Sequence, residues 1–367
     1  MKKIFIFLMI FSTFIFTGCG KNNIETIFKD LTDKVNELEA YKLEGNLEVK
    51  NENNSYSYDV SVSYMSKDKF KVSLINNSNN HEQVILRNDD GVFVLTPSLN
   101  KSFKFQSDWP YNNSQIYLLG SIIDDLNNDK NLVKEEENGK YIFTSSVNYP
   151  NNSNLVKQKV LVTNDLSIEK VEVLNNDGEP EMTFTIKSID YAPTFDESYF
   201  EVNSIINTNT NNQGSTSPSN TDKTTENTND TNSNSKNNDT QNNQNTTEPT
   251  ATIEDIIYPL YLPSGTVLEE QEKVSKTDGE RVILTFGGEK GFTLVEETVT
   301  KEEEFTVIPT YGEPAQINDT IGAVTDNSLN WISGDMEYYL VSDVMSSQEL
   351  LDVANSIDIS SSVASLK

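Results

Sequence analysis

Two spacings of apolar residues organise the first half of this chain. A helical spacing comes first, at Ile24, Ile27, Phe28, Leu31, Val35 and Leu38, with charged residues between them. Short runs that alternate apolar and polar residues follow, each bounded by Asn, Asp, Ser or Gly, as expected for antiparallel strands with one buried face. We expect strands at residues 41–49, 56–64, 70–74, 84–86, 92–95, 103–105, 141–147, 155–162, 168–174 and 182–189.

A second helical spacing interrupts these strands between Ser114 and Leu126. The first half therefore predicts one long antiparallel sheet with two helices. A twisted sheet of about ten strands tends to curl. We expect the two helices to lie against its concave face.

The end of the chain repeats this mixture on a smaller scale. The hairpin turn Gly334-Asp335 joins two of its strands, and Ser346 to Glu349 has the pattern of a capping box that opens a last helix. These features predict a small α+β domain. Its strands are expected at residues 267–272, 281–286, 292–299, 306–309, 321–325, 330–333 and 337–342.

A polar stretch at residues 207–250 separates the two halves. It contains no aliphatic or aromatic residue and consists mostly of Asn, Thr, Ser and Gln. Such a stretch buries too little apolar surface to offset its ordering entropy, so we predict a disordered linker. The predicted domains are then residues 24–206 and residues 251–367.

The first residues have the layout of a secretory leader. Two lysines precede 13 nearly continuous apolar residues, a segment too short to span a bilayer comfortably. The segment ends in Phe16-Thr17-Gly18-Cys19, which resembles the bacterial lipobox. The resemblance implies cleavage between Gly18 and Cys19, transfer of diacylglycerol to the Cys19 thiol, and often a further acyl chain such as palmitate.

We therefore expect a signal peptide at residues 1–18, a lipidated N-terminus at residues 19–23, and anchoring at the extracytoplasmic face of the cell membrane. An ordinary secretory leader with a chance cysteine is the alternative. Against it, Cys19 is the single cysteine of the chain and falls at the cleavage position.

The charge and the residue types exclude several classes of function. The chain has 57 acidic against 28 basic residues and a formal net charge of −29, which is unfavourable for nucleic-acid binding. With one cysteine and one histidine, His81, zinc sites and Cys–His or Ser–His–Asp machinery are improbable. A carboxylate-only calcium site stays open, although no stretch has the spacing of a calcium loop. We expect no catalytic residue, no resident metal and no cofactor, and hence no enzyme.

Other motifs are interpreted as structural. The acidic runs Glu135–Glu137 and Glu302–Glu304 are interpreted as solvated surface. The alternative is a glycosidase site, because glycosidases use two carboxyl groups held across a cleft as catalytic groups. Asp89–Gly91 and Asp177–Glu179 are interpreted as hairpin tips, and Gly287–Gly291 as a turn because it lacks the P-loop spacing. Trp109 and Trp331 are expected in the core or at its rim, and His81 in an exposed turn.

Several segments of the first domain together resemble a known superfamily. They are the first helix, the strand Tyr41–Gly45, and the segment Asp108–Gln115 with Tyr117–Leu119. They are similar to the LolA/LolB/RseB superfamily, and in particular to LolA-like lipoproteins of Gram-positive spore formers such as the GerS type. The resemblance implies an incomplete antiparallel β-barrel with a helical lid over an apolar concavity. In LolA this concavity carries acyl chains, and in RseB-like and GerS-like proteins the surface engages proteins.

The tail, residues 329–357, resembles a small domain of unknown function in envelope and sporulation proteins of Gram-positive bacteria. The leading hypothesis is a membrane-anchored, non-enzymatic lipoprotein that binds or regulates another envelope protein in sporulation, germination or wall modification. The alternative is a carrier or sensor that binds an apolar ligand, such as an acyl chain, in the concave face. A wall hydrolase is a third hypothesis, for which the chain shows no catalytic constellation.

Overall fold

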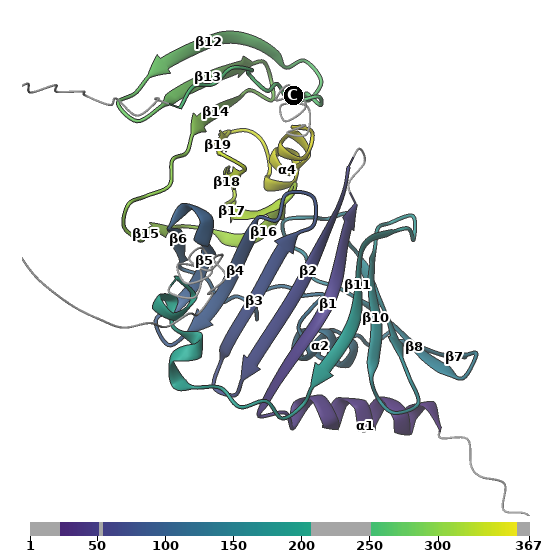
Figure 1. Cartoon of the computed structure of the whole chain (residues 1–367). Coiled ribbons are helices and arrows are strands. Elements are labelled where there is room, and N and C mark those ends of the chain that lie inside the picture. The colour runs from purple at the N-terminus through teal and green to yellow at the C-terminus, as the bar shows by residue number, and fades with distance from the viewer. Residues whose placement is uncertain (1–22, 51–53, 207–250, 358–367) are drawn as a thin grey trace, which may run out of the picture.

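The computed structural model describes residues 23–50, 54–206 and 251–357. Within these residues the first half forms most of a large sheet with strand order β15-β6-β5-β4-β3-β2-β1-β11-β10-β9-β8-β7 (Figure 1). All neighbours are antiparallel except β15 and β6. The strands that come from the first half are β1 (Ala40–Lys50), β2 (Ser55–Met65), β3 (Lys69–Asn76), β4 (Glu82–Asn88), β5 (Gly91–Thr96), β6 (Lys101–Phe105), β7 (Val133–Glu137), β8 (Lys140–Ser146), β9 (Lys157–Val162), β10 (Ile168–Leu174) and β11 (Pro180–Asp190).

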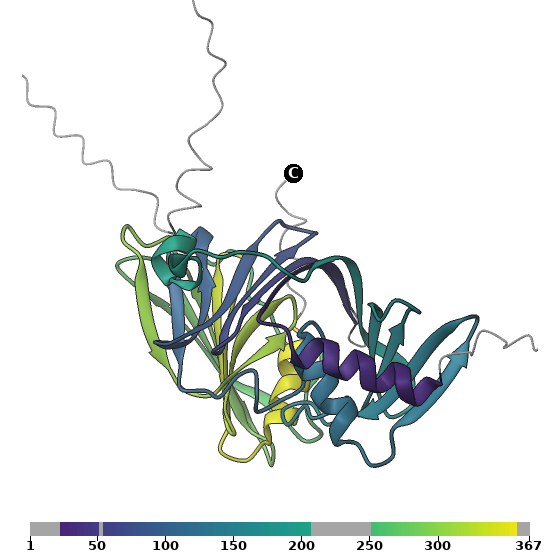
Figure 2. The same ribbon diagram turned by 90° about the horizontal axis from the view of Figure 1, so that it is seen from below.

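Two helices pack against one face of this sheet. In α1 (Ile24–Asn36) the Asn23 side chain caps the first turn by accepting a hydrogen bond from the Glu25 amide at 3.1 Å. The buried side chains of α1 and of α2 (Leu119–Asn128) join one core with the inward positions of the strands. Figure 2 shows both helices on the inner side of the curved sheet. This arrangement confirms the predicted unclosed antiparallel sheet with helices against it.

A close contact explains the glycine of the Tyr41–Gly45 segment. The register of β1 against β11 shifts between Glu44 and Gly45. A Cβ atom at Gly45 would lie 2.6 Å from the Phe184 ring, which is fully buried. The aromatic ring therefore fills the space above the glycine, and any side chain here would displace it.

Three elements of the described part of the first half differ from the sequence-based expectation. The second helix begins at Leu119 and not at Ser114, because Ser114 is held by two hydrogen bonds of 2.8 Å with Asn148, which keep residues 114–118 in a turn. The expected strand at 155–162 begins at Lys157, after a turn that includes Leu155. Strand β7 was missed because its charged residues show no alternation of apolar and polar positions.

The second half forms its own sheet, with the order β12-β13-β14-β19-β18-β17-β16. Helix α4 (Ser347–Asn355) packs on this sheet, and both hydrogen bonds of the predicted capping box are present between Ser346 and Glu349. The predicted hairpin turn, with Gly334 at φ +59°, joins β18 to β19. The strands are β12 (Val267–Ser275), β13 (Glu280–Gly287), β14 (Phe292–Thr298), β16 (Glu313–Ile317), β17 (Thr320–Val324), β18 (Ser328–Ser333) and β19 (Met336–Val341). The sequence did not indicate β16.

Strand β15 (Thr306–Thr310) connects the two halves in a way that the sequence did not predict. It was expected as a strand of the second domain, but it pairs in parallel with β6 of the first sheet (Figure 1). The Thr306 amide donates to the Asn100 carbonyl at 2.9 Å, and the Asn100 side-chain amide donates to the Glu302 carbonyl at 2.7 Å. Residues far apart in sequence therefore hold the two halves together.

Some predictions concern residues outside the described ranges. The leader, Cys19 and the linker at 207–250 all lie there, so the signal peptide, the lipid anchor and the division of the chain into domains stay predictions. Within the described residues, no helix is long and apolar enough to cross a membrane.

Candidate functional site

The candidate site is a cavity of about 590 Å³ between the first sheet and the second domain. Strand β1 supplies Leu47 and Val49 to its apolar part, because alternate residues of that strand face inward. Helix α4 contributes Leu351 from the opposite side. Further apolar or aromatic lining residues are Ile85, Ile116, Tyr117, Tyr149, Pro150, Leu155, Met182, Tyr261, Pro314, Ala315 and Ile321.

The remaining wall of the cavity is rich in side-chain amides. In the first half they come from three loops, namely the one before α2, the one between β8 and β9, and the one between β10 and β11. In the second half they come from β16, from the turn that follows β16, and from α4. Four charged residues also line the cavity, namely Lys50, Asp177, Glu181 and Asp352. The amide residues are Asn113, Gln115, Asn151, Asn152, Asn154, Asn175, Asn176, Gln316, Asn318, Gln348 and Asn355.

Asn318 is the most constrained of these residues. It is 3% exposed, and its backbone has a left-handed φ of +50°. Its amide nitrogen Nδ2 donates to the Ala354 carbonyl at 2.7 Å, and its backbone N–H donates to Asn355 Oδ1 at 3.0 Å. Its Oδ1 atom is buried and has no hydrogen-bond partner in the part of the chain that the structure describes.

Glutamine side chains fix the second domain over the first sheet. Gln83 of β4 accepts from the Ile321 amide at 2.6 Å and donates to the Ile321 carbonyl at 3.1 Å. The Gln83 side-chain amide thus forms hydrogen bonds with both the N–H and the C=O of Ile321, as a residue of a neighbouring strand would. Gln316 donates to the Tyr58 hydroxyl at 3.0 Å, and Gln348 accepts from the Ser153 amide at 2.7 Å. Gln316, Ile321 and Gln348 also line the cavity, so these bonds hold parts of its wall in place.

A smaller cavity of about 30 Å³ lies between β2–β4 and the β16–β17 turn. His81 and Asp319 both line it, so His81 is half-buried at a domain contact and not in a freely exposed turn as expected. Burial raises the pKa of Asp319. A hydrogen bond of 2.7 Å that the Ser333 hydroxyl donates to Asp319 lowers this pKa, but by less than burial raises it.

A buried carboxyl group lies on the covered face of the second sheet. Glu296 of β14 is fully buried beside Tyr338 of β19. Its Oε2 accepts from the Ile257 amide at 3.2 Å, and its Oε1 has no partner. Burial raises the pKa of Glu296 to about 7. Among the described residues, no three His, Cys, Asp or Glu side chains come together as a metal site requires.

The other sequence-predicted features have mostly structural positions. Trp109 and Trp331 are both 1% exposed, in agreement with the expectation. Asp89–Gly91 forms the turn from β4 to β5, Asp177–Glu179 the turn from β10 to β11, and Gly287–Gly291 the connection from β13 to β14. The residues that sequence reasoning missed are Gln83, Gln316 and Asn318. Their amides resemble the many other amides of the chain, so only the fold distinguishes them.

Comparison with known proteins places the chain among sporulation proteins. Residues 1–200 match the family model for sporulation protein YdcC-like proteins. The chain is also 32% identical over 365 residues to sporulation protein YdcC of Bacillus subtilis (strain 168), with 98% of each chain covered. The chain belongs to the YdcC-like sporulation protein family. The expected kinship with sporulation proteins of spore formers is therefore confirmed.

Solved structures with a similar fold include members of the resembled superfamily. The Pseudomonas aeruginosa MucA/MucB complex matches at 13% identity and a TM-score of 0.29, with 90% of this chain and 98% of the other covered. The CwlD amidase of Clostridioides difficile in complex with the GerS lipoprotein matches at 19% identity and a TM-score of 0.29. The match covers 48% of this chain and 99% of the other. The LolA superfamily protein NE2245 of Nitrosomonas europaea matches at 10% identity and a TM-score of 0.29. The match covers 48% of this chain and 98% of the other. At these TM-scores the likeness has no bearing on function.

Proposed function

We propose that this YdcC-like protein is a lipid-anchored, non-enzymatic envelope protein that binds a segment of another envelope protein in the cavity between its two domains. The observation that carries the proposal is the chemistry of the cavity wall. An apolar floor from β1 and α4 faces a wall of side-chain amides.

A polypeptide segment matches this wall better than an acyl chain does. Each Asn or Gln side chain offers both a donor and an acceptor, as does each peptide unit of a bound segment. An acyl chain would cover these groups without bonding them, which costs about 1–3 kcal/mol for each buried group left unpaired. The cavity volume of about 590 Å³ is enough for a few side chains.

The apolar floor favours the acyl chain as the second candidate ligand. Native mass spectrometry of the chain without its leader, purified in the absence of detergent, separates the two. A mass excess that matches a lipid would support a carrier or sensor. A purified protein without bound lipid, together with a partner protein crosslinked to it in sporulating cells, would support protein binding.

Filling the cavity should weaken partner binding. Ala315 lies half-buried at the cavity wall, so Ala315→Phe places an aromatic ring where the ligand would lie. We expect recovery of a crosslinked partner from sporulating cells to fall at least tenfold, together with the sporulation frequency. The matched control is Ala192→Phe, at an exposed position away from the cavity. Equal recovery from both variants would contradict binding in the cavity.

The anchor is tested by Cys19→Ala. Each buried methylene of an acyl chain contributes about 0.8 kcal/mol to membrane binding, so a protein without the lipid should leave the membrane fraction almost completely. Fractionation followed by immunoblotting measures this. Normal sporulation by a variant that has left the membrane would argue against a tethered mechanism.

A further inference from the structure

Strand β12 leaves one whole edge of the second sheet unpaired. Within residues 23–50, 54–206 and 251–357 it is the terminal strand of that sheet and pairs with β13 alone. Eight of its nine residues are exposed, including Val267 at 59% and Leu268 at 41%. Along this edge the backbone N–H and C=O groups that point away from β13 are available to another strand.

Two of the usual protections of an edge strand, proline and a lysine free of other contacts, are missing from β12. It contains no proline, and its one lysine, Lys273, is turned back to the Ile253 carbonyl at 2.9 Å and to Glu280 at 2.8 Å. The single irregularity is a register shift between Leu268 and Glu270. Six residues from Glu270 to Ser275 therefore run in unbroken register, which is long enough for another strand to add to the edge.

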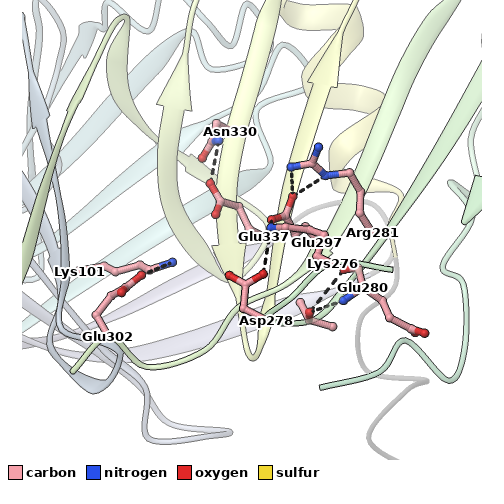
Figure 3. Close-up of polar contacts among 10 residues, drawn as sticks. Lys101, Lys276, Asp278, Glu280, Arg281, Glu297, Glu302, Asn330 and Glu337 are labelled. Atoms are coloured by element: carbon pink, nitrogen blue, oxygen red, sulfur yellow. Dashed lines mark hydrogen bonds and ion pairs between the residues drawn. The ribbon is translucent and has the colours of Figure 1, made fainter. Parts of the chain in front are cut away.

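The exposed charge along this edge is negative. Glu270 and Glu272 share the outer side of the sheet, since they pair in register with Thr285 and Ile283. Neither forms an ion pair within the described residues. The nearby cations Arg281 and Lys276 both contact Glu297, as Figure 3 shows, so they do not neutralise the edge.

We propose that the free edge of β12 binds an extended, basic segment of a partner protein by β-strand addition. Main-chain hydrogen bonds would supply affinity, and lysine or arginine side chains at alternate positions would lie beside Glu270 and Glu272. A second copy of this chain is disfavoured as the occupant. An antiparallel self-pair centred on Gln271 sets Glu270 of one copy opposite Glu272 of the other, where like charges repel.

The test uses the chain without its leader and a fluorescently labelled nine-residue peptide that alternates lysine and valine. Fluorescence anisotropy should show saturable binding, and hydrogen exchange should slow at residues 267–275 on addition of the peptide. A peptide that has the same lysines but proline for valine should bind weakly and leave exchange unchanged. It keeps the charge but favours a polyproline conformation that forms no strand ladder.

Charge reversal on the edge provides the specific variant. Glu270→Lys with Glu272→Lys should weaken binding of the lysine–valine peptide about tenfold and allow binding of a glutamate–valine peptide. The control, Glu197→Lys with Glu201→Lys, makes the same change of net charge at exposed positions of the first half and should alter affinity less than threefold. Equal losses in both variants, or unchanged exchange in β12, would overturn the proposal.

Discussion

Replacing Glu296 by glutamine should stabilise the second domain by about 3 kcal/mol at pH 8. The folded state raises the pKa of this carboxyl group from 4.5 to about 7, so between these values the folded state binds more protons than the unfolded state does. Stability therefore falls as the pH rises from about 4.5 to about 7. Glutamine has nearly the same shape, can accept the Ile257 hydrogen bond, and does not ionise.

Hydrogen exchange of β14 and β19 at pH 5 and pH 8 measures this effect. The variant should lose most of the pH dependence of the wild type. Glu297→Gln is the control on the same strand. Burial disfavours the ionised form of Glu297, but hydrogen bonds from Lys276 and Arg281 outweigh it and lower its pKa. That variant should be less stable than the wild type at pH 8. A Glu296→Gln protein with unchanged pH dependence would show that the buried carboxyl group is not the cause.

Ile308→Pro should release β15 from the first sheet. In a parallel strand, the backbone groups of alternate residues bond to the same neighbouring strand. The Thr306 amide donates to the Asn100 carbonyl next to β6, so the backbone N–H of Ile308, two residues later, also faces β6. Pro309 faces the free edge, where a missing N–H costs little. The substitution removes a ladder hydrogen bond and introduces a clash, at a cost of about 2 kcal/mol or more.

Amide exchange at β6 should then be roughly 30-fold faster, which is the equivalent of 2 kcal/mol. Val307→Pro is the matched control, because the Val307 N–H faces the free edge and has no partner in β6, so its loss should have a small effect. The interdomain cavity needs both domains in place, so Ile308→Pro should also lower recovery of the crosslinked partner. Equal exchange in the two proline variants would mean that β15 contributes little to the joint.

Local pattern was sufficient for most of the elements. The alternation along β1 predicted that Leu47 and Val49 face inward, and Ser346 with Glu349 predicted the start of α4. Strand β7 could not be found this way, because its pairing with β8 and not its own composition makes it a strand. The partner of β15 was equally hidden, since a five-residue run carries no information about which edge it joins.

The candidate site depended even more on the fold. The resemblance to the LolA/LolB/RseB superfamily implied an apolar concavity in the first domain, and the acidic composition argued against nucleic acid. The sequence could not indicate that α4 and β16 close this concavity, nor that Gln83 bonds Ile321 across 238 positions of the chain. Among so many asparagines, those that come together around the cavity are visible only once their neighbours are in place.

The sequence by itself determined the secondary-structure periods and the helix cap, because each depends on residues close together in the chain. The lipobox and the division into two domains stay predictions from the same kind of local pattern. Only the tertiary structure decided the cavity, the crossing of β15, the buried Glu296 and the open edge of β12. These features depend on burial and on pairing between distant segments, and neither is encoded in any local pattern of residues.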